Sequence, residues 1–277
     1  MNITFIGGGN MAQAIIHGLL GKSRQEFSLA NLRVVEINPE TRQKLKSLGI
    51  GCFTKAWEAI RDDDVIIFAV KPQNMRDAAD ELRKNYTGGV WLDKRLVISI
   101  AAGIKLGDLS QWLRNTRLIR AMPNTPALTG DGITALYSFP GVSEMDKQCA
   151  DKILAAVGKT VWVNDEDEMN AVTAISGSGP AYVFLFMEAI EQAAAELKMP
   201  KDVARELVLQ TFIGASRLAA DSREPLAALR ERVTSKGGTT EAALNSMAAD
   251  QVKEAIIRAV KAAYERAREL GDELGKH

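Results

Sequence analysis

Near its N-terminus the chain reads Gly7-Gly8-Gly9-Asn10-Met11-Ala12, between a short apolar run, Ile3 to Ile6, and a segment with helical apolar spacing. A G-x-G-x-x-A turn in the order strand, turn, helix is typical of a dinucleotide-binding βαβ unit. Gly7 permits the tight turn, Gly9 lets the backbone approach a pyrophosphate, and the small Ala12 lets the helix pack close to the strand. The N–H groups of Asn10 and Met11, at the helix start, would hold the phosphates.

Outward from this turn, short β-rich runs alternate with helical segments up to residue 163. This alternation indicates parallel βαβ units with helices on both faces, so residues 1–163 are expected to form a Rossmann-type α/β domain that binds a nicotinamide dinucleotide. Asn38 followed by Pro39 predicts an N-cap for a helix that runs to about Leu48. Further strands are expected at Leu32–Ile37, Val65–Val70, Leu96–Ile100, Leu118–Met122, Ile133–Tyr137 and Thr160–Val163.

From residue 164 to 277 the β-branched runs disappear, and an all-α domain is expected. Ser176–Pro180 holds three helix breakers, which predicts a bend or restart there. Tyr182–Met187 is apolar on every face, as in a helix that is buried all round. A long amphipathic helix is expected from Gln251 to Leu270. A domain of this size has difficulty covering both segments, so we expect a homodimer or a larger ring of dimers, with the helical domain forming the shared core.

The composition narrows the function classes. The chain has 277 residues, with 35 Lys plus Arg against 35 Asp plus Glu, so it lacks the positive field of a nucleic-acid binder. Cys52 and Cys149 are the only cysteines and match no metal-ligand spacing, which favours a metal-free protein in a reducing cytoplasm. No apolar run reaches the ~20 residues that span a bilayer, so no membrane association is expected.

Three residues at the end of the second expected strand bear on the choice of dinucleotide. Glu36 would accept hydrogen bonds from the adenosine ribose and favour NAD. Asn38 and Arg42 lie just beyond it and could serve the 2′-phosphate of NADP. These residues leave the cofactor preference open.

Two more stretches follow the carboxyl ends of expected strands, where ligands of open α/β sheets bind. They are Ala69-Val70-Lys71-Pro72 and Ala101-Ala102-Gly103, and we expect both to contribute to the cofactor site. Lys71 either lines the cofactor cleft or is simply solvated, as loop lysines commonly are.

Three further stretches have unusual runs of Gly, Pro, Ser and Thr. They are Arg120-Ala121-Met122-Pro123-Asn124-Thr125-Pro126, Ser176-Gly177-Ser178-Gly179-Pro180-Ala181-Tyr182 and Val233-Thr234-Ser235-Lys236-Gly237-Gly238-Thr239-Thr240. Together with the glycine turn and Ala69-Val70-Lys71-Pro72, they closely resemble the pyrroline-5-carboxylate reductases, the NAD(P)H enzymes that make L-proline, in the same order over essentially the whole chain. One position departs, because that family usually has proline where this chain has Lys236. Lysine leaves φ unfixed and predicts a looser loop.

The resemblance implies hydride transfer from NADP(H), with NAD(H) as the alternative, to L-1-pyrroline-5-carboxylate. It implies Thr240 as the residue that orients or protonates the imine nitrogen, and places Ser176 at the active-site cleft as a substrate-binding residue. Asn124 is expected among the cofactor-binding residues. The substrate carboxylate is expected on Ser235, Gly237, Gly238 and Thr239. The same segment would cap the helix that follows, and both roles can hold because a helix cap and an anion site use the same N–H groups.

The residue chemistry agrees with reduction of an imine. Reduction of a ketone commonly needs a His or Lys acid, whereas a cyclic imine can be protonated before hydride attack, so that a hydroxyl donor suffices. The only histidines are His17, on the helix after the glycine turn, and His277, at the chain end, and neither is expected to act. Two alternatives are a 3-hydroxyacid or ketopantoate-type dehydrogenase, which would need a catalytic lysine, and a cofactor-binding regulatory protein without turnover.

Overall fold

The computed structural model describes residues 1–22, 27–61, 64–85 and 94–275. These residues form two compact units, each described by itself. The Rossmann unit comprises Met1–Ser178 together with the chain from Ala263 on, and the helical unit comprises Gly179–Ala262. The compact units divide after Ser178, and the domain boundary expected after residue 163 stays a prediction.

In the described residues, eight strands form the sheet of the Rossmann unit: β1 (Asn2–Ile6), β2 (Leu32–Val35), β3 (Gly51–Phe53), β4 (Asp64–Phe68), β5 (Val97–Ser99), β6 (Leu118–Met122), β7 (Gly132–Ser138) and β8 (Gly158–Trp162). Their order is β3-β2-β1-β4-β5-β6-β7-β8. The pairs from β3 to β6 are parallel, β7 runs antiparallel to β6, and β8 is parallel to β7. The expected parallel pattern therefore holds for the first six strands, and the last two run the other way.

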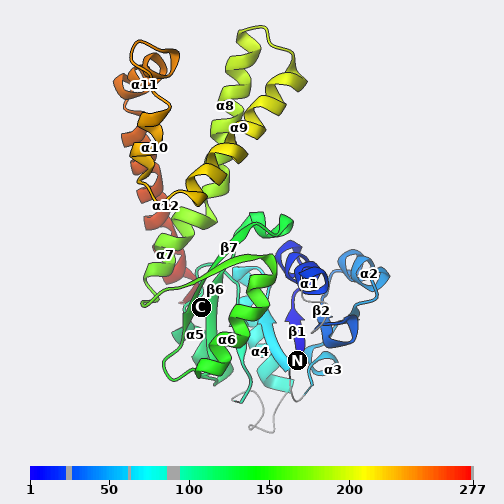
Figure 1. Cartoon of the computed structure of the whole chain (residues 1–277). Helices are drawn as coiled ribbons and strands as arrows, with labels where there is room; N and C mark the ends of the chain where they lie inside the picture. The colour runs from blue at the N-terminus through cyan, green and yellow to red at the C-terminus, as the bar shows by residue number, and fades with distance from the viewer. Residues whose placement is uncertain (23–26, 62–63, 86–93, 276–277) are drawn as a thin grey trace. The chain divides into compact units, whose positions relative to one another are not determined.

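The helices of the Rossmann unit cover both faces of this sheet (Figure 1). Side chains of α1, α2 and α6 share one buried cluster with the sheet, and side chains of α3, α4 and α5 share the other. Neighbours on β4 alternate between the two clusters, as Ile67 joins the first and Phe68 the second, because successive strand side chains point to opposite faces. The helices are α1 (Asn10–Lys22), α2 (Pro39–Ser47), α3 (Ala56–Ala59), α4 (Met75–Asn85), α5 (Leu106–Leu113), α6 (Glu144–Leu154), α7 (Glu168–Val172) and the last part of α12 (Val252–Gly275).

Local signals in the sequence set several of these boundaries. Asn38 caps α2 as expected, because its side chain accepts a hydrogen bond from the Thr41 N–H and Pro39 occupies the first turn. The second strand ends at Val35, two residues before the expected end. Strand β3 was not expected, since a three-residue edge strand is too short for an apolar alternation to show.

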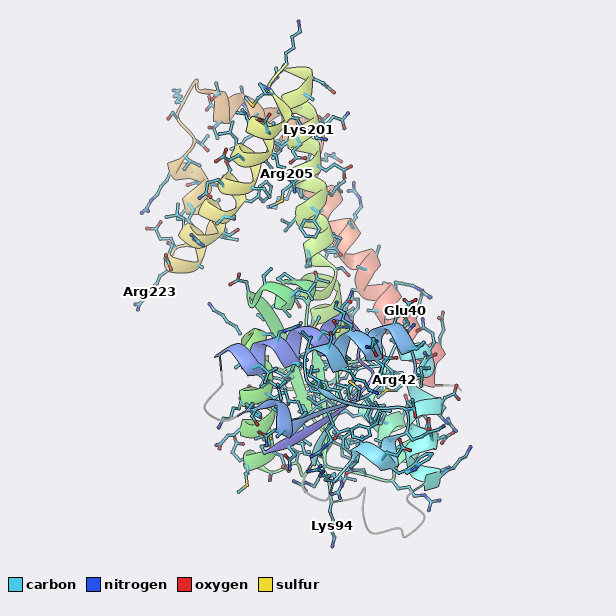
Figure 2. The ribbon with its side chains drawn as sticks, turned by 90° about the vertical axis from the view of Figure 1, so that its right-hand side faces the viewer. Glu40, Arg42, Lys94, Lys201, Arg205 and Arg223 are labelled. Carbon is cyan, nitrogen blue, oxygen red and sulfur yellow. The ribbon has the colours of Figure 1, made fainter. Side chains whose placement is uncertain are left out.

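The helical unit contains α8 (Gly179–Glu196), α9 (Lys201–Asp221), α10 (Leu226–Arg232), α11 (Thr239–Ala249) and the first part of α12. Helices α8 and α9 pack side by side, and the Arg205 side chain on α9 (Figure 2) lies 3.5 Å from the Glu191 carboxylate on α8. All of residues 179–262 are described, and the only buried apolar side chains among them are Ala204 and Val208. None of the helices that the structure describes is long and apolar enough to cross a membrane.

The apolar segment of α8 is not covered within this chain. A domain of this size was expected to have difficulty covering Tyr182–Met187 with its own elements, and Phe184 is 63% and Leu185 is 64% exposed. The neighbouring helices of the same chain do not cover these side chains.

Candidate active site

The glycine turn has the geometry that its sequence predicts. Gly7 has φ +100°, and a Cβ on it would lie 2.7 Å from the Ala69 carbonyl oxygen, so only glycine fits. A Cβ on Gly9 would meet no atom within 4 Å, which leaves open space at the start of α1. Ala12, in the first turn of α1, is fully buried. Open space beside helix-start N–H groups suits a pyrophosphate, so these residues fit a dinucleotide.

The end of β2 is organised around the Glu36 carboxylate. One of its oxygens accepts the Gly8 N–H at 2.8 Å, and the other accepts the Asn38 N–H at 2.8 Å. The Arg42 guanidinium, on α2 (Figure 2), donates to the carbonyl oxygens of Glu36 at 2.8 Å and Ile37 at 3.2 Å. The structure therefore brings the three predicted ribose-site residues together and links Glu36 directly to the glycine turn.

The two other predicted cofactor loops lie at the same edge of the sheet, at the carboxyl ends of β4 and β5. The first is fixed by the Ala69 N–H, which donates to the Ile6 carbonyl at 2.8 Å and so joins the ends of β1 and β4. In the second, Gly103 has φ +77°, a left-handed conformation that favours glycine. Lys71 is exposed at the start of a short 3₁₀ turn, Pro72–Asn74.

Asn124 and Ser176 are hydrogen-bonded to each other. The Asn124 Nδ2 donates to the Ser176 carbonyl oxygen at 3.2 Å, and the Asn124 Oδ1 accepts the Ile133 N–H at 2.9 Å. Ser176 lies in a π-helical turn, Thr173–Gly177, that leads directly to α8 at Gly179. The bend or restart expected at Ser176–Pro180 is confirmed, because the π turn ends at Gly177, Ser178 forms a bend, and α8 starts at Gly179.

The predicted substrate loop lies in the helical unit, at the start of α11. Gly238 is the N-cap, and the half-buried Thr240 lies in the first turn. The Gly237 N–H donates to the Glu241 carboxylate at 2.7 Å, and the Gly238 N–H donates to the Ser235 carbonyl at 3.0 Å. Lys236 and Thr239 are exposed. The loop thus presents N–H groups at a helix start, and one of them already binds a carboxylate of the chain itself.

Sequence reasoning missed Gln13, and it did not predict the contact that Glu241 makes with Gly237. Gln13 donates through its Nε2 to the Gly8 carbonyl at 2.8 Å and holds the glycine turn from within α1. Glu241 occupies the Gly237 N–H, and its position four residues on, in the first turn of a helix, is a signal for such a contact. His17 is exposed, and His277 lies outside the described residues.

Comparison with known proteins shows that both halves of the chain match parts of known reductases. Residues 166–270 match the family model for pyrroline-5-carboxylate reductase dimerisation, and residues 2–103 match a model described as coenzyme F420-dependent NADP oxidoreductase. The pyrroline-5-carboxylate reductase of Pasteurella multocida is 40% identical over 275 residues, which is 97% of each chain. This chain belongs to the pyrroline-5-carboxylate reductase family.

Solved structures of pyrroline-5-carboxylate reductases agree with this assignment. The enzyme from Coxiella burnetii is 36% identical, with a TM-score of 0.86 over 97% of this chain and 98% of that one. The Plasmodium falciparum enzyme, solved with NADP bound, is 28% identical, with a TM-score of 0.83 over 98% of each chain. The family and the fold expected from the sequence are therefore both confirmed.

Proposed function

We propose that this chain reduces L-1-pyrroline-5-carboxylate to L-proline by hydride transfer from NAD(P)H, as the final step of proline biosynthesis. The observation that carries the proposal is the 40% identity to a pyrroline-5-carboxylate reductase over 97% of both chains. The glycine turn and the helix-start loop at Ser235–Thr240 give the two halves of this chemistry a structural basis.

The cofactor half of the site lies along the carboxyl edge of the Rossmann sheet. Gly7, Gly9, Asn10 and Met11 would hold the pyrophosphate at the start of α1. The group at Glu36 would take the adenosine ribose, and the loops at residues 69–72 and 101–103 would line the rest of the site. The nicotinamide supplies the hydride when the cofactor is bound. We propose NADP(H) as a working cofactor, supported by the NADP-bound Plasmodium relative, with NAD(H) as the alternative.

The substrate half would use backbone groups for the carboxylate and a hydroxyl for the imine. N–H groups at the start of α11 attract an anion through the helix dipole and need no basic side chain. Thr240 would orient or protonate the imine nitrogen, which makes the ring carbon electrophilic before the hydride arrives. Glu241 must yield the Gly237 N–H if that group is to bind the substrate carboxylate.

We further propose that the working form is a homodimer, or a ring of dimers, joined through the helical unit. Residues 179–262 bury only two apolar side chains within the chain, while Phe184 and Leu185 stay exposed. A groove of about 710 Å³ in this unit is lined by apolar side chains such as Phe186, Leu244 and Ile256 and also by charged ones such as Arg230 and Glu254. Obligate interfaces resemble a domain core cut in half, and a second copy would complete this one.

A cytoplasmic location is part of the proposal. Cys52 and Cys149 are free thiols in the structure, and burial raises the pKa of both. Thiols with raised pKa values stay protonated and inert at neutral pH, as suits a protein that needs no disulfide.

The test is an assay of NADH and NADPH oxidation in parallel, with pyrroline-5-carboxylate as the substrate and proline measured as the product. Steady turnover with stoichiometric proline supports the proposal. Cofactor binding without turnover would instead indicate a regulatory protein, and turnover with a 3-hydroxyacid would indicate the alternative dehydrogenase.

A further inference from the structure

The π-helical turn at Thr173–Gly177 lacks a donor that an ordinary helix would have. In an α-helix the Ser176 carbonyl would accept the N–H of the residue four positions ahead, and that residue is Pro180, which has no N–H. The turn is wide, because the Ser178 N–H reaches back to the Thr173 carbonyl at 2.9 Å. Without another partner, the Ser176 carbonyl would be an unsatisfied acceptor in a half-buried residue.

Asn124 supplies the missing donor from a distant part of the chain. Its Nδ2 donates to the Ser176 carbonyl at 3.2 Å, while its Oδ1 is held by the Ile133 N–H at 2.9 Å. The second bond fixes the amide orientation, since the oxygen faces an N–H and the nitrogen faces a carbonyl. Asn124 therefore fastens the π turn to the loop between β6 and β7.

Close packing accompanies this hydrogen bond. A Cβ on Gly177 would lie 2.8 Å from the Met122 methyl carbon, so only glycine allows this approach without a shift of the methionine. The Ser176 hydroxyl donates to the Val172 carbonyl at 3.0 Å, which sets the serine side chain relative to the turn. Two distinctive stretches of the sequence, around Asn124 and Ser176, thus form one contact.

We propose that Asn124 is a positioning residue that replaces the donor missing at Pro180 and so fixes the turn that carries Ser176. Its amide oxygen and one amide hydrogen are used inside the fold, so we assign it to positioning Ser176 rather than to cofactor contact. The catalytic part of this inference rests on the proposed function, whereas the structural part, the coupling between Asn124 and Pro180, does not.

A double-mutant cycle tests the structural part without any activity measurement. Asn124→Ala should lower the urea midpoint of unfolding. Pro180→Ala restores an N–H for the Ser176 carbonyl. In the Pro180→Ala variant, Asn124→Ala should therefore lower the urea midpoint by less than roughly half as much as it does in the wild type. Asn124→Asp keeps the acceptor for the Ile133 N–H and loses the donor, and should show the same coupling. Additive midpoint shifts for Asn124→Ala and Pro180→Ala would overturn the proposal.

Kinetics and cofactor titration test the positioning role in the full-length enzyme. Asn124→Ala should lower kcat/KM for pyrroline-5-carboxylate by roughly tenfold or more, as expected when a contact group is misplaced, with the Kd for NADPH nearly unchanged. Pro180→Ala should restore part of that loss. A Kd for NADPH that rises as much as kcat/KM falls would make Asn124 a cofactor ligand and overturn the assignment.

Asn115 provides a matched control in the same unit. Its Nδ2 donates to the Arg95 carbonyl at 3.0 Å and its Oδ1 accepts the Arg117 N–H at 2.7 Å, so it makes the same two kinds of bond away from the predicted site. Asn115→Ala should lower the urea midpoint and leave kcat/KM unchanged. If it lowers kcat/KM as much as Asn124→Ala does, the effect is general destabilisation and the positioning role is refuted.

Discussion

The two units of this chain differ in how they bury apolar surface. The Rossmann unit places its sheet between two buried clusters that contain most of the large side chains shielded from solvent, such as Phe5, Ile15 and Phe68. All residues of the helical unit, 179–262, are described, and the only apolar side chains that it buries are Ala204 and Val208. One unit has a core of its own within the chain, and the other buries very little apolar surface within it.

This difference separates two parts of the function. The groups proposed to bind the dinucleotide lie at the edge of a sheet whose packing is complete within one chain. The loop with Thr240 starts a helix of the unit that lacks a core. Cofactor binding should therefore survive in a single chain, whereas turnover should depend on assembly.

The largest effect is expected from a substitution of Leu185, which should abolish the activity that depends on the helical unit and leave cofactor binding by the Rossmann unit intact. Leu185→Glu places a charge on an apolar side chain that is 64% exposed in the single chain and, in the proposed dimer, buried. An unpaired buried charge costs several kcal/mol, enough to dissociate the dimer at micromolar concentration. Sedimentation equilibrium should give a mass near the 30.1 kDa of one chain, with turnover lost and NADPH binding kept.

Met145 is the matched control for this substitution. It is an apolar side chain on α6 of the Rossmann unit and is 79% exposed. Met145→Glu should leave both mass and turnover unchanged, because an exposed substitution outside any interface changes little. A wild-type protein that sediments as one chain with full activity would refute the proposed dimer. It would also refute the inference that turnover depends on assembly while cofactor binding does not.

How far the sequence predicts this molecule depends on whether a signal is local. The glycine turn and the Asn38 cap were predictable, because each is a short pattern with one backbone conformation that suits it. The incomplete cover of Tyr182–Met187 within one chain was also predictable from the size of the domain, whereas an apolar helix face does not show which surface covers it.

Contacts between distant residues were the other limit. Asn124 and Ser176 were each singled out from the sequence, yet the hydrogen bond between them joins residues 52 positions apart. The three breakers at Ser176–Pro180 predicted the bend at Ser178 and the restart at Gly179, but they did not indicate the π turn before it or the long-range donor from Asn124. The roles of Thr240 and of the predicted cofactor residues stay predictions.

The second-largest effect is expected at Thr240, in the helical unit. Thr240→Val keeps the shape of the side chain and removes the hydroxyl, and should lower kcat by roughly tenfold to a hundredfold, less than a full general-acid effect because the imine can arrive protonated. Thr240→Ser is the control and should keep most of the activity. A change confined to KM would assign Thr240 to binding alone.

Glu36, in the Rossmann unit, should affect cofactor choice with a smaller effect. Its carboxylate repels a 2′-phosphate, so Glu36→Ala should raise the kcat/KM ratio of NADPH to NADH by roughly tenfold. Because Glu36 also accepts the Gly8 N–H, both cofactors should bind more weakly in this variant. Glu36→Gln retains an acceptor and should raise the ratio with less loss of affinity. An unchanged ratio in both variants would show that Glu36 does not face the ribose.

The smallest effect is a pH dependence of stability confined to the Rossmann unit. Burial disfavours the charged form of Asp146, but hydrogen bonds from Arg117, at 2.7 and 3.1 Å, and from Ser143 outweigh it and hold the pKa of the carboxyl below its ordinary value. A lowered folded-state pKa stabilises the fold above the unfolded pKa of about 3.9, and this stabilisation is lost as pH falls through the folded value.

Asp146→Asn should therefore lower the free energy of unfolding at pH 7 by about 1 kcal/mol, a modest value because Arg117 is partly exposed. The difference from wild type should close as pH falls below about 4. Glu144→Gln, on the same helix but in an exposed pair with Lys147, is the control and should change nothing. Urea unfolding followed across pH and at two protein concentrations measures both differences. The change in free energy of unfolding caused by Asp146→Asn should be the same at both concentrations, because the partners of Asp146 lie within one chain. A change that varied with protein concentration would contradict a Rossmann unit that is stabilised by its own contacts alone.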